Sequence, residues 1–238
     1  MKVDILAFAA HPDDVELSCS GTLLKEIYSG KKVAIVDLTE GELGSRGSVE
    51  TRYREAELSA SILGLSAREN LNIGDGTFEN NHQNRLKIIA AIRKYQPDLV
   101  LANAPKDRHP DHGRASSLVS EAFFYAGLRR IETFENGVCQ KEWRPNLLLH
   151  YIQDQYLEPD FVVDVSDFWE KRMESVKAYK TQFYDPESKE PNTPISSAEF
   201  LDFLEARGAS FGRPIGVKYA EGFIKSRIPG VNYLTDLI

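Results

Sequence analysis

Short apolar runs recur through the first hundred residues, and each one ends in a group of polar residues. Runs of this length, rich in Val, Ile, Leu and Ala, are typical of strands buried on both faces of a parallel sheet. The stretches between them carry apolar residues at helical spacing and stop at Gly30, Gly64 or Pro97. The pattern predicts strands at residues 3–10, 32–38, 69–73 and 98–102, separated by helices at residues 17–28, 49–63 and 84–95.

This alternation of strands and helices predicts an α/β protein with a Rossmann-like, mainly parallel sheet flanked by helices. A length of 238 residues suits a single domain over residues 1–238. Ligands of such folds bind beyond the carboxyl ends of the strands, so the loops after the first, second and fourth strands are the expected site. The second half predicts helices at residues 113–126, 167–179 and 198–209, strands at 147–152 and 161–165, a loop at 184–194 and an edge strand at 217–224.

Composition supports a folded protein and narrows its partners. Hydrophobic residues make up 42% and charged residues 27% of the chain, and 29 basic against 36 acidic residues give a net charge of -7. This acidic balance disfavours nucleic acid as the main partner, because phosphate binding needs a basic face. It does not exclude an acidic small molecule, which a few arginines in a pocket can hold.

Neither the chain start nor the cysteines indicate export. Residues 1–8 are interrupted by Asp4 and predict a strand instead of a signal peptide, and no apolar run is long enough to span a membrane. Cys19 and Cys139 form no closely spaced pair, which argues against a thiolate zinc ribbon or a disulfide framework. We expect both cysteines to be small buried hydrophobic residues in a cytoplasmic protein without membrane contact.

The histidines carry the chemical signal. His11 follows the first strand and is joined by Asp13 and Asp14, while His109 and His112 share one His-Pro-Asp-His motif after the fourth strand. Zinc binds His nitrogen and Asp oxygen, and catalytic sites keep three protein ligands. His11, Asp14 and one histidine of the second motif make such a set, which leaves Asp13 free as a general base.

These residues also fit other interpretations. Asp13 or Asp14 could simply cap the following helix. A two-metal phosphoesterase usually needs more carboxylate and histidine ligands than this chain offers, because only five histidines occur and two of them, His82 and His150, are isolated. We expect these two histidines to be structural or exposed. A dinucleotide site is disfavoured because the first loop lacks a glycine fingerprint and its acidic residues would repel a pyrophosphate. The alternative outside the enzymes is a module that binds metal without catalysing a reaction.

The two motifs, Ala10-His11-Pro12-Asp13-Asp14-Val15-Glu16 and Arg108-His109-Pro110-Asp111-His112, resemble those of the LmbE/PIG-L-like zinc deacetylases. The similarity extends over nearly the whole chain. Residues 37–44, 178–184 and 219–223 are similar to the branch that deacetylates N-acetylglucosaminyl-malate in bacillithiol synthesis. The resemblance implies zinc-dependent removal of an N-acetyl group from an amino-sugar conjugate, and a homo-oligomer, up to a hexamer. Free N-acetylglucosamine or a chito-oligosaccharide is the alternative substrate.

The resemblance also implies a role for individual positions. His11, Asp14 and His112 match the zinc ligands, and Asp13 matches the general base. His109 matches the residue that stabilises the oxyanion or protonates the leaving amine, with Asp111 tuning it, and Arg52 matches a substrate-binding arginine. The sequence departs from the pattern at three positions, which are Phe200, where some relatives use a tyrosine, and Ser18 and Ser20, where glycines are expected.

The substrate-binding residues and the metal ion each fit more than one assignment. A malate group brings two carboxylates, which call for guanidinium partners, and Arg46, Arg52 and Arg108 lie in or beside the expected loops. Arg46 fits solvated surface charge equally well, and Arg108 fits a brace to a neighbouring carboxylate. Gln182 and Tyr184 could line the pocket or pack in the core. Zn²⁺ is the expected ion, although Fe²⁺ or another divalent ion suits the same ligands.

Overall fold

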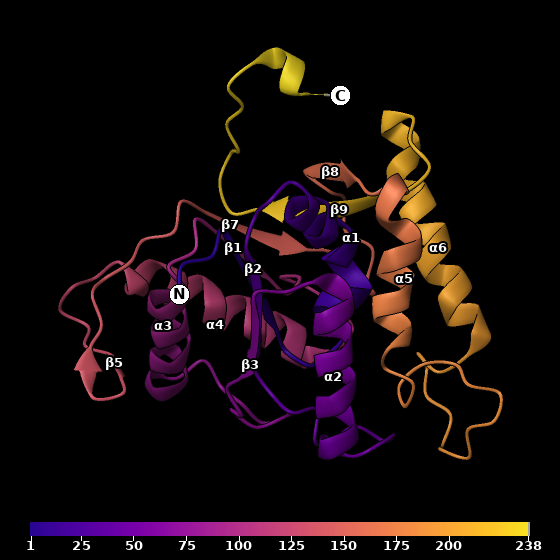
Figure 1. Ribbon diagram of the computed structural model, residues 1–238, viewed down its shortest axis with the longest axis horizontal. Helices are drawn as coiled ribbons and strands as arrows, with labels where there is room; N and C mark the ends of the chain where they lie inside the picture. The colour runs from indigo at the N-terminus through magenta and orange to yellow at the C-terminus, as the bar shows by residue number, and fades with distance from the viewer. Residues whose placement is uncertain (238) are drawn as a thin grey trace.

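A seven-stranded sheet with strand order β3-β2-β1-β4-β7-β9-β8 forms the centre of the protein (Figure 1). The computed structural model describes residues 1–237. The five strands from β3 to β7 are parallel, whereas β9 is antiparallel to both of its neighbours. The strands are β1 (Ile5–Ala9), β2 (Val33–Asp37), β3 (Ala67–Asn70), β4 (Leu99–Ala102), β7 (Leu147–Tyr151), β8 (Phe161–Asp164) and β9 (Ala220–Lys225).

Alternating side chains of the buried strands separate two apolar layers. In β1, Leu6 and Phe8 face the layer covered by α3 (His82–Tyr95) and α4 (Pro110–Ala126). Ile5 and Ala7 face the opposite layer, which α1 (Asp14–Tyr28) covers together with the end of α2 (Val49–Leu63). Both faces are covered here, so β1 and β4 are apolar throughout, as the sequence pattern predicts, whereas the edge strand β3 reads Ala-Arg-Glu-Asn and is only partly buried.

The second half of the chain builds an outer layer against α1 and α2. It contains α5 (Trp169–Lys177) and α6 (Ala198–Gly212), with the short 3-10 turn η1 (Ser166–Phe168) before α5 and η2 (Arg213–Ile215) after α6. A third 3-10 turn, η3 (Leu234–Asp236), lies in the exposed segment after β9. A cluster of Ala56, Val176, Tyr179, Phe183 and Leu204 joins α2, α5 and α6. In Figure 1 these helices stand on the side of the molecule opposite α3. A hairpin of β5 (Phe134–Glu135) and β6 (Val138–Cys139) completes the structure.

The α/β class, the parallel sheet and the alternation of elements are confirmed, and several boundaries are corrected. The last strand is not at an edge: β9 lies between β7 and β8, with Phe223 paired to both Tyr151 and Phe161. Helices α1 and α4 each begin three residues earlier than predicted, at Asp14 and Pro110, because the motif residues themselves form the first turns.

Two further observations concern the cysteines and the membrane. Cys19 is buried as expected, whereas Cys139 is exposed, because it lies in the β5–β6 hairpin, which the apolar pattern does not predict. Within residues 1–237, none of the helices combines the length and apolar character needed to cross a lipid bilayer. The end of the predicted domain, residue 238, lies outside the described residues.

Candidate active site

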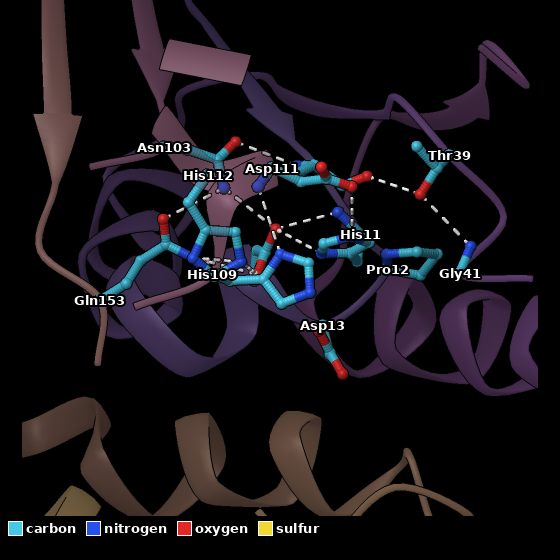
Figure 2. Close-up of polar contacts among 12 residues, drawn as sticks. His11, Pro12, Asp13, Thr39, Gly41, Asn103, His109, Asp111, His112 and Gln153 are labelled. Atoms are coloured by element: carbon cyan, nitrogen blue, oxygen red, sulfur yellow. Dashed lines mark hydrogen bonds and ion pairs between the residues drawn. The ribbon is translucent and has the colours of Figure 1, made fainter. Parts of the chain in front are cut away.

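Three histidines from two distant loops meet at the carboxyl end of the parallel strands. His11 follows β1, while His109 and His112 follow β4 and enter α4. Their ring centres lie 4.7 to 5.6 Å apart, and they can present ring nitrogens within 4.8 Å of one another (Figure 2). The expected convergence of the loops after the first and fourth strands is therefore present.

Asp14 lies between two of these histidines. Its Oδ1 is 3.0 Å from Nε2 of His112 and its Oδ2 is 3.7 Å from Nδ1 of His11. Oδ2 also accepts hydrogen bonds from the His11 amide at 2.9 Å and from Nδ2 of Asn103 at 3.0 Å. Burial would raise the pKa of Asp14, but the charges and hydrogen bonds of His112 and His11 outweigh it and lower the pKa.

The other ring nitrogen of each histidine is held by a different carboxylate. Nδ1 of His112 lies 2.6 Å from Oδ2 of Asp107, and Nε2 of His11 lies 3.0 Å from Asp75 and 3.4 Å from Asp111. Carboxylates behind a histidine fix its ring and its tautomer in metal sites. The nitrogens that face Asp14 are thus oriented by a second layer of acidic groups, as a divalent cation requires.

The same carboxylates determine the charge of the histidines in this cluster. Burial would lower the pKa of His11, but hydrogen bonds to Asp111 and Asp75 together with the nearby Asp14 raise it to about 10. For His112, burial is likewise outweighed by Asp14 and Asp107, which raise its pKa to about 9. The two imidazoles are thus surrounded by more buried carboxylates than they can neutralise. This set of nitrogen and oxygen donors fits a divalent metal ion.

Asp13 differs from Asp14 in both backbone and surroundings. Its φ of 121° lies in a region that residues other than glycine rarely adopt, and such strain is common at functional sites. Although it occupies the N-cap of α1, its side chain makes no capping hydrogen bond within the described residues. Instead it extends away from the hydrogen-bonded cluster (Figure 2). The capping interpretation is therefore wrong for Asp13.

Arg52 supports Asp13 from α2. Its Nη1 donates to the Pro12 carbonyl at 2.8 Å and to Oδ2 of Asp13 at 3.4 Å. Burial raises the pKa of Asp13 to about 7, and the charge of Arg52 opposes this shift. Gly41, with φ of 66°, lets the loop at residues 39–48 pass over the guanidinium, since a Cβ there would lie 3.3 Å from Nη1.

His109 lies at the N-cap of α4, where its Nδ1 accepts the Asp111 amide at 3.3 Å. Burial and the charge of His11 lower its pKa, so the ring is neutral at physiological pH. The Asp111 carboxylate points away from His109 and accepts hydrogen bonds from the Gly76 amide and from Nη1 of Arg114, each at 2.8 Å. The carboxylate expected to tune His109 thus contacts His11, and only its backbone contacts His109.

A cavity of about 260 Å³ opens beside these groups. The predicted residues Arg52, Arg108 and Gln182 line it, and Phe200 forms part of its apolar wall. Arg108 also pairs with Asp154 at 2.6 Å, so the expected brace to a carboxylate is present. Tyr184 is exposed and is not among the lining residues.

Arg46 does not reach the cavity. It is 5% exposed, and its guanidinium donates to the carbonyls of Thr181 and Pro191 and to Oγ of Ser188. Neither prediction for this residue, substrate contact or solvated surface charge, describes its position. Its role is to hold residues 181–191 against the glycine loop.

Several residues of the site were not predicted from the sequence. Gln153, which follows β7, donates from Nε2 to Oδ1 of Asp14 at 3.0 Å. The prediction considered the loops after only three strands, whereas β3 and β7 end at the same edge of the sheet. That rule applied to β3 and β7 as well would have indicated Asp75, Gln153 and Asp154. Asn103 and Asp107 lie in the loop after β4, which the prediction did include, but their contacts depend on side-chain directions that the sequence does not give.

The two remaining histidines are outside the cluster. His150 is buried, and its Nδ1 lies 2.8 Å from the Asn103 carbonyl and 3.1 Å from Oγ of Ser116. His82 is exposed at the start of α3. The expectation that these two are structural or exposed is confirmed.

Comparison with known proteins adds a family match. A family model described as PIG-L: GlcNAc-PI de-N-acetylase matches residues 6–123. The diacetylchitobiose deacetylase of Thermococcus kodakarensis is 30% identical over 95% of this chain and 84% of its own. A probable N-acetyl-alpha-D-glucosaminyl L-malate deacetylase 2 of Bacillus anthracis is 24% identical over 75% of this chain and 81% of its own. The solved structure of the conserved protein TT1542 from Thermus thermophilus superposes with a TM-score of 0.85 and 34% identity, covering 97% of this chain and 98% of that one.

Proposed function

Because this chain belongs to the PIG-L/LmbE family of deacetylases and is therefore an amide hydrolase, we propose that it removes the acetyl group from an N-acetylglucosamine conjugate. The observation that carries the proposal is the cluster of His11, Asp14 and His112, which lines a cavity together with the adjacent Asp13. A storage site for metal needs neither a strained carboxylate next to its ligands nor a cavity lined by arginines.

We assign the metal ligands to His11, Asp14 and His112, and the ion to Zn²⁺. His109 also comes within 4.8 Å of the other two histidines, but its Nδ1 is occupied by the Asp111 amide. When bound, a divalent ion at this position supplies Lewis acidity toward an amide carbonyl and lowers the pKa of water. Fe²⁺ fits the same two histidines and one carboxylate.

Asp13 is the proposed general base. A carboxylate with a pKa near 7 is half ionised at neutral pH, which suits a group that must accept a proton from water and return it. Arg52 keeps the ionised form available and fixes the orientation of the carboxylate. The proton that Asp13 accepts comes from the water that attacks the acetamide carbon.

His109 is the proposed hydrogen-bond donor to the developing oxyanion, while the proton that Asp13 accepts from water goes to the departing nitrogen. Since its Nδ1 accepts the Asp111 amide, the ring proton of the neutral form is on Nε2. A neutral donor suffices here, because a hydrogen bond aimed at the tetrahedral intermediate stabilises its negative charge. Glucosamine then leaves as an amine, and acetate is the second product.

The group attached to the sugar is the finer part of the proposal. Arg108 and Arg52 line the cavity, which favours the N-acetylglucosaminyl-malate expected from the sequence. A second sugar in place of malate is the other candidate, because the Thermococcus kodakarensis relative is named for diacetylchitobiose and matches nearly the whole chain.

Acetate release tests both levels of this proposal. The purified protein is assayed on N-acetylglucosaminyl-malate, N,N'-diacetylchitobiose and free N-acetylglucosamine, with and without a chelator. We expect turnover of at least one conjugate, loss of that turnover on chelation, and recovery with Zn²⁺. Activity that survives chelation would contradict the metal assignment, and a rate on free N-acetylglucosamine equal to that on both conjugates would contradict a conjugate as substrate.

A further inference from the structure

One arginine in the cavity wall has no acidic partner. Arg207, on α6, lines the cavity, as do Arg52 and Arg108. Arg52 lies against Asp13 and Arg108 pairs with Asp154, whereas Arg207 makes no ion pair among residues 1–237. Its neighbours Gln153 and Leu17 offer only backbone carbonyls, to which Nη1 and Nη2 donate.

These two hydrogen bonds leave most of the guanidinium donors unused. A guanidinium carries five N–H groups in a planar fork that matches the two oxygens of a carboxylate. The fork is held in place from both sides, because its carbonyl partners belong to α1 and to the segment after β7. Burial and the neighbouring Arg172 lower the pKa of Arg207 to about 10, which leaves it charged at neutral pH.

A second unpartnered donor lies in the same wall. Ser18 is 4% exposed, and its Oγ has no hydrogen-bond partner among the described residues. Ser18 and Arg207 together line the main cavity and also a smaller one directly behind it. A buried hydroxyl without a partner is costly, and a ligand oxygen that accepts from it removes that cost.

The acidic groups near Arg207 all have other partners. Asp154 pairs with Arg108 at 2.6 Å, Glu221 with Arg172 at 3.0 Å and Asp107 with His112 at 2.6 Å. Arg207 therefore contributes an excess cation to the lining. The cavity thus combines metal-type ligands with a guanidinium that has no acidic partner among the described residues.

We propose that Arg207 and Ser18 form a subsite for a carboxylate on the group attached to the sugar, so that the enzyme prefers acidic N-acetylglucosamine conjugates over neutral ones. The inference rests on the proposed function and specifies its substrate class. Arg207 acts in selectivity and takes no part in proton transfer. The alternative is a purely structural role, in which Arg207 only connects α1 to the segment after β7.

The test compares two substrates in four variants. Kinetics are measured on N-acetylglucosaminyl-malate and on N,N'-diacetylchitobiose for Arg207→Gln, Arg207→Lys, Ser18→Ala and the exposed control Arg213→Gln. We expect Arg207→Gln to lower kcat/KM for the acidic conjugate about 10- to 100-fold, mainly through KM, with less than about a threefold change on the neutral one. Arg207→Lys should recover part of the preference, Ser18→Ala should lose less of it, and Arg213→Gln should behave as wild type.

The outcomes separate this inference from the proposed function. An equal loss on both substrates, or no acidic preference in the wild type, would show that Arg207 is only a brace. An equal response to N-acetylglucosamine 1-phosphate would show that the site reads charge and not a carboxylate. If the wild type releases acetate from neither conjugate, the proposed function fails. The subsite is then tested by calorimetry, which measures binding of N-acetylglucosaminyl-malate to the chelated protein. Weaker binding by Arg207→Gln supports the subsite, and unchanged binding overturns it.

Discussion

The two halves of the chain contribute to the cavity in different ways. Residues 6–123, which the family model matches, contain all three clustered histidines and the carboxylates around them. The later half supplies other lining residues, among them Gln153, Gln182, Phe200, Leu204 and Arg207. The first set is held by parallel strands and helix starts, whereas the second comes from α6 and from segments between elements.

This difference separates reaction chemistry from substrate selection. Groups fixed at strand ends keep the geometry that proton transfer and metal binding require, because the sheet on which they sit is buried on both faces. Loops and an outer helix tolerate change more easily, so they are the part that can adapt to different attached groups. Variants of the clustered histidines and of Asp13 should affect all substrates alike, and variants of Arg207 in the later half should discriminate among them.

The largest expected effect comes from the reaction half. Asp13→Ala should lower kcat about 10²- to 10⁴-fold on every conjugate, because it removes the proposed base. Metal content, measured on the purified protein, should stay at the wild-type level, since Asp14 and both histidines are unchanged. Asp13→Asn is the matched variant of equal size. Near-normal turnover in either variant would remove Asp13 from the mechanism.

An intermediate effect is expected where a carboxylate supports a ligand. Asp107→Asn should weaken Zn²⁺ binding about 10- to 100-fold, because the hydrogen bond to Nδ1 of His112 orients that ring. Titration against a competing chelator measures the affinity, and kcat at saturating Zn²⁺ should recover. The exposed Asp167→Asn serves as control. Unchanged affinity in Asp107→Asn would mean that the hydrogen bond from Asp107 to His112 does not support metal binding.

The smallest effect concerns the wall. Phe200→Ala should raise KM about 3- to 10-fold with little change in kcat, because it removes apolar contact made equally in the ground and transition states. Phe134→Ala is the control, since Phe134 is exposed in the β5–β6 hairpin and does not line the cavity. A fall in kcat as large as that of Asp13→Ala would erase the distinction between the two halves.

Much of the fold and the centre of the site follow from local signals in the sequence. Apolar runs between glycines locate the parallel strands, and two histidine motifs at strand ends locate the cluster. The position of β9 does not follow, because strand order depends on contacts between distant segments, and Phe223 pairs with residues about 60 to 70 positions away. No local pattern distinguishes an edge strand from one inserted between two others.

Side-chain directions were the other part that the sequence could not provide. Asp111 is adjacent in sequence to the histidines of its own motif, yet its carboxylate contacts His11 from the first motif. Arg46 is in the expected loop but turns toward Thr181. Both outcomes depend on which rotamer is compatible with the packed neighbours, and this becomes defined only once the tertiary structure is known.

The insertion of β9 between β7 and β8 has a consequence for how the site is assembled. Residues 220–225 follow both neighbouring strands in the sequence, and until they are in place β7 and β8 cannot join one sheet through them. Glu221 on this strand also accepts hydrogen bonds from the Gly21 and Thr22 amides of α1 and from Nε of Arg172. One strand thus closes the sheet and fixes the helix that carries Asp14, so folding of the site depends on a contact between residues about 200 positions apart.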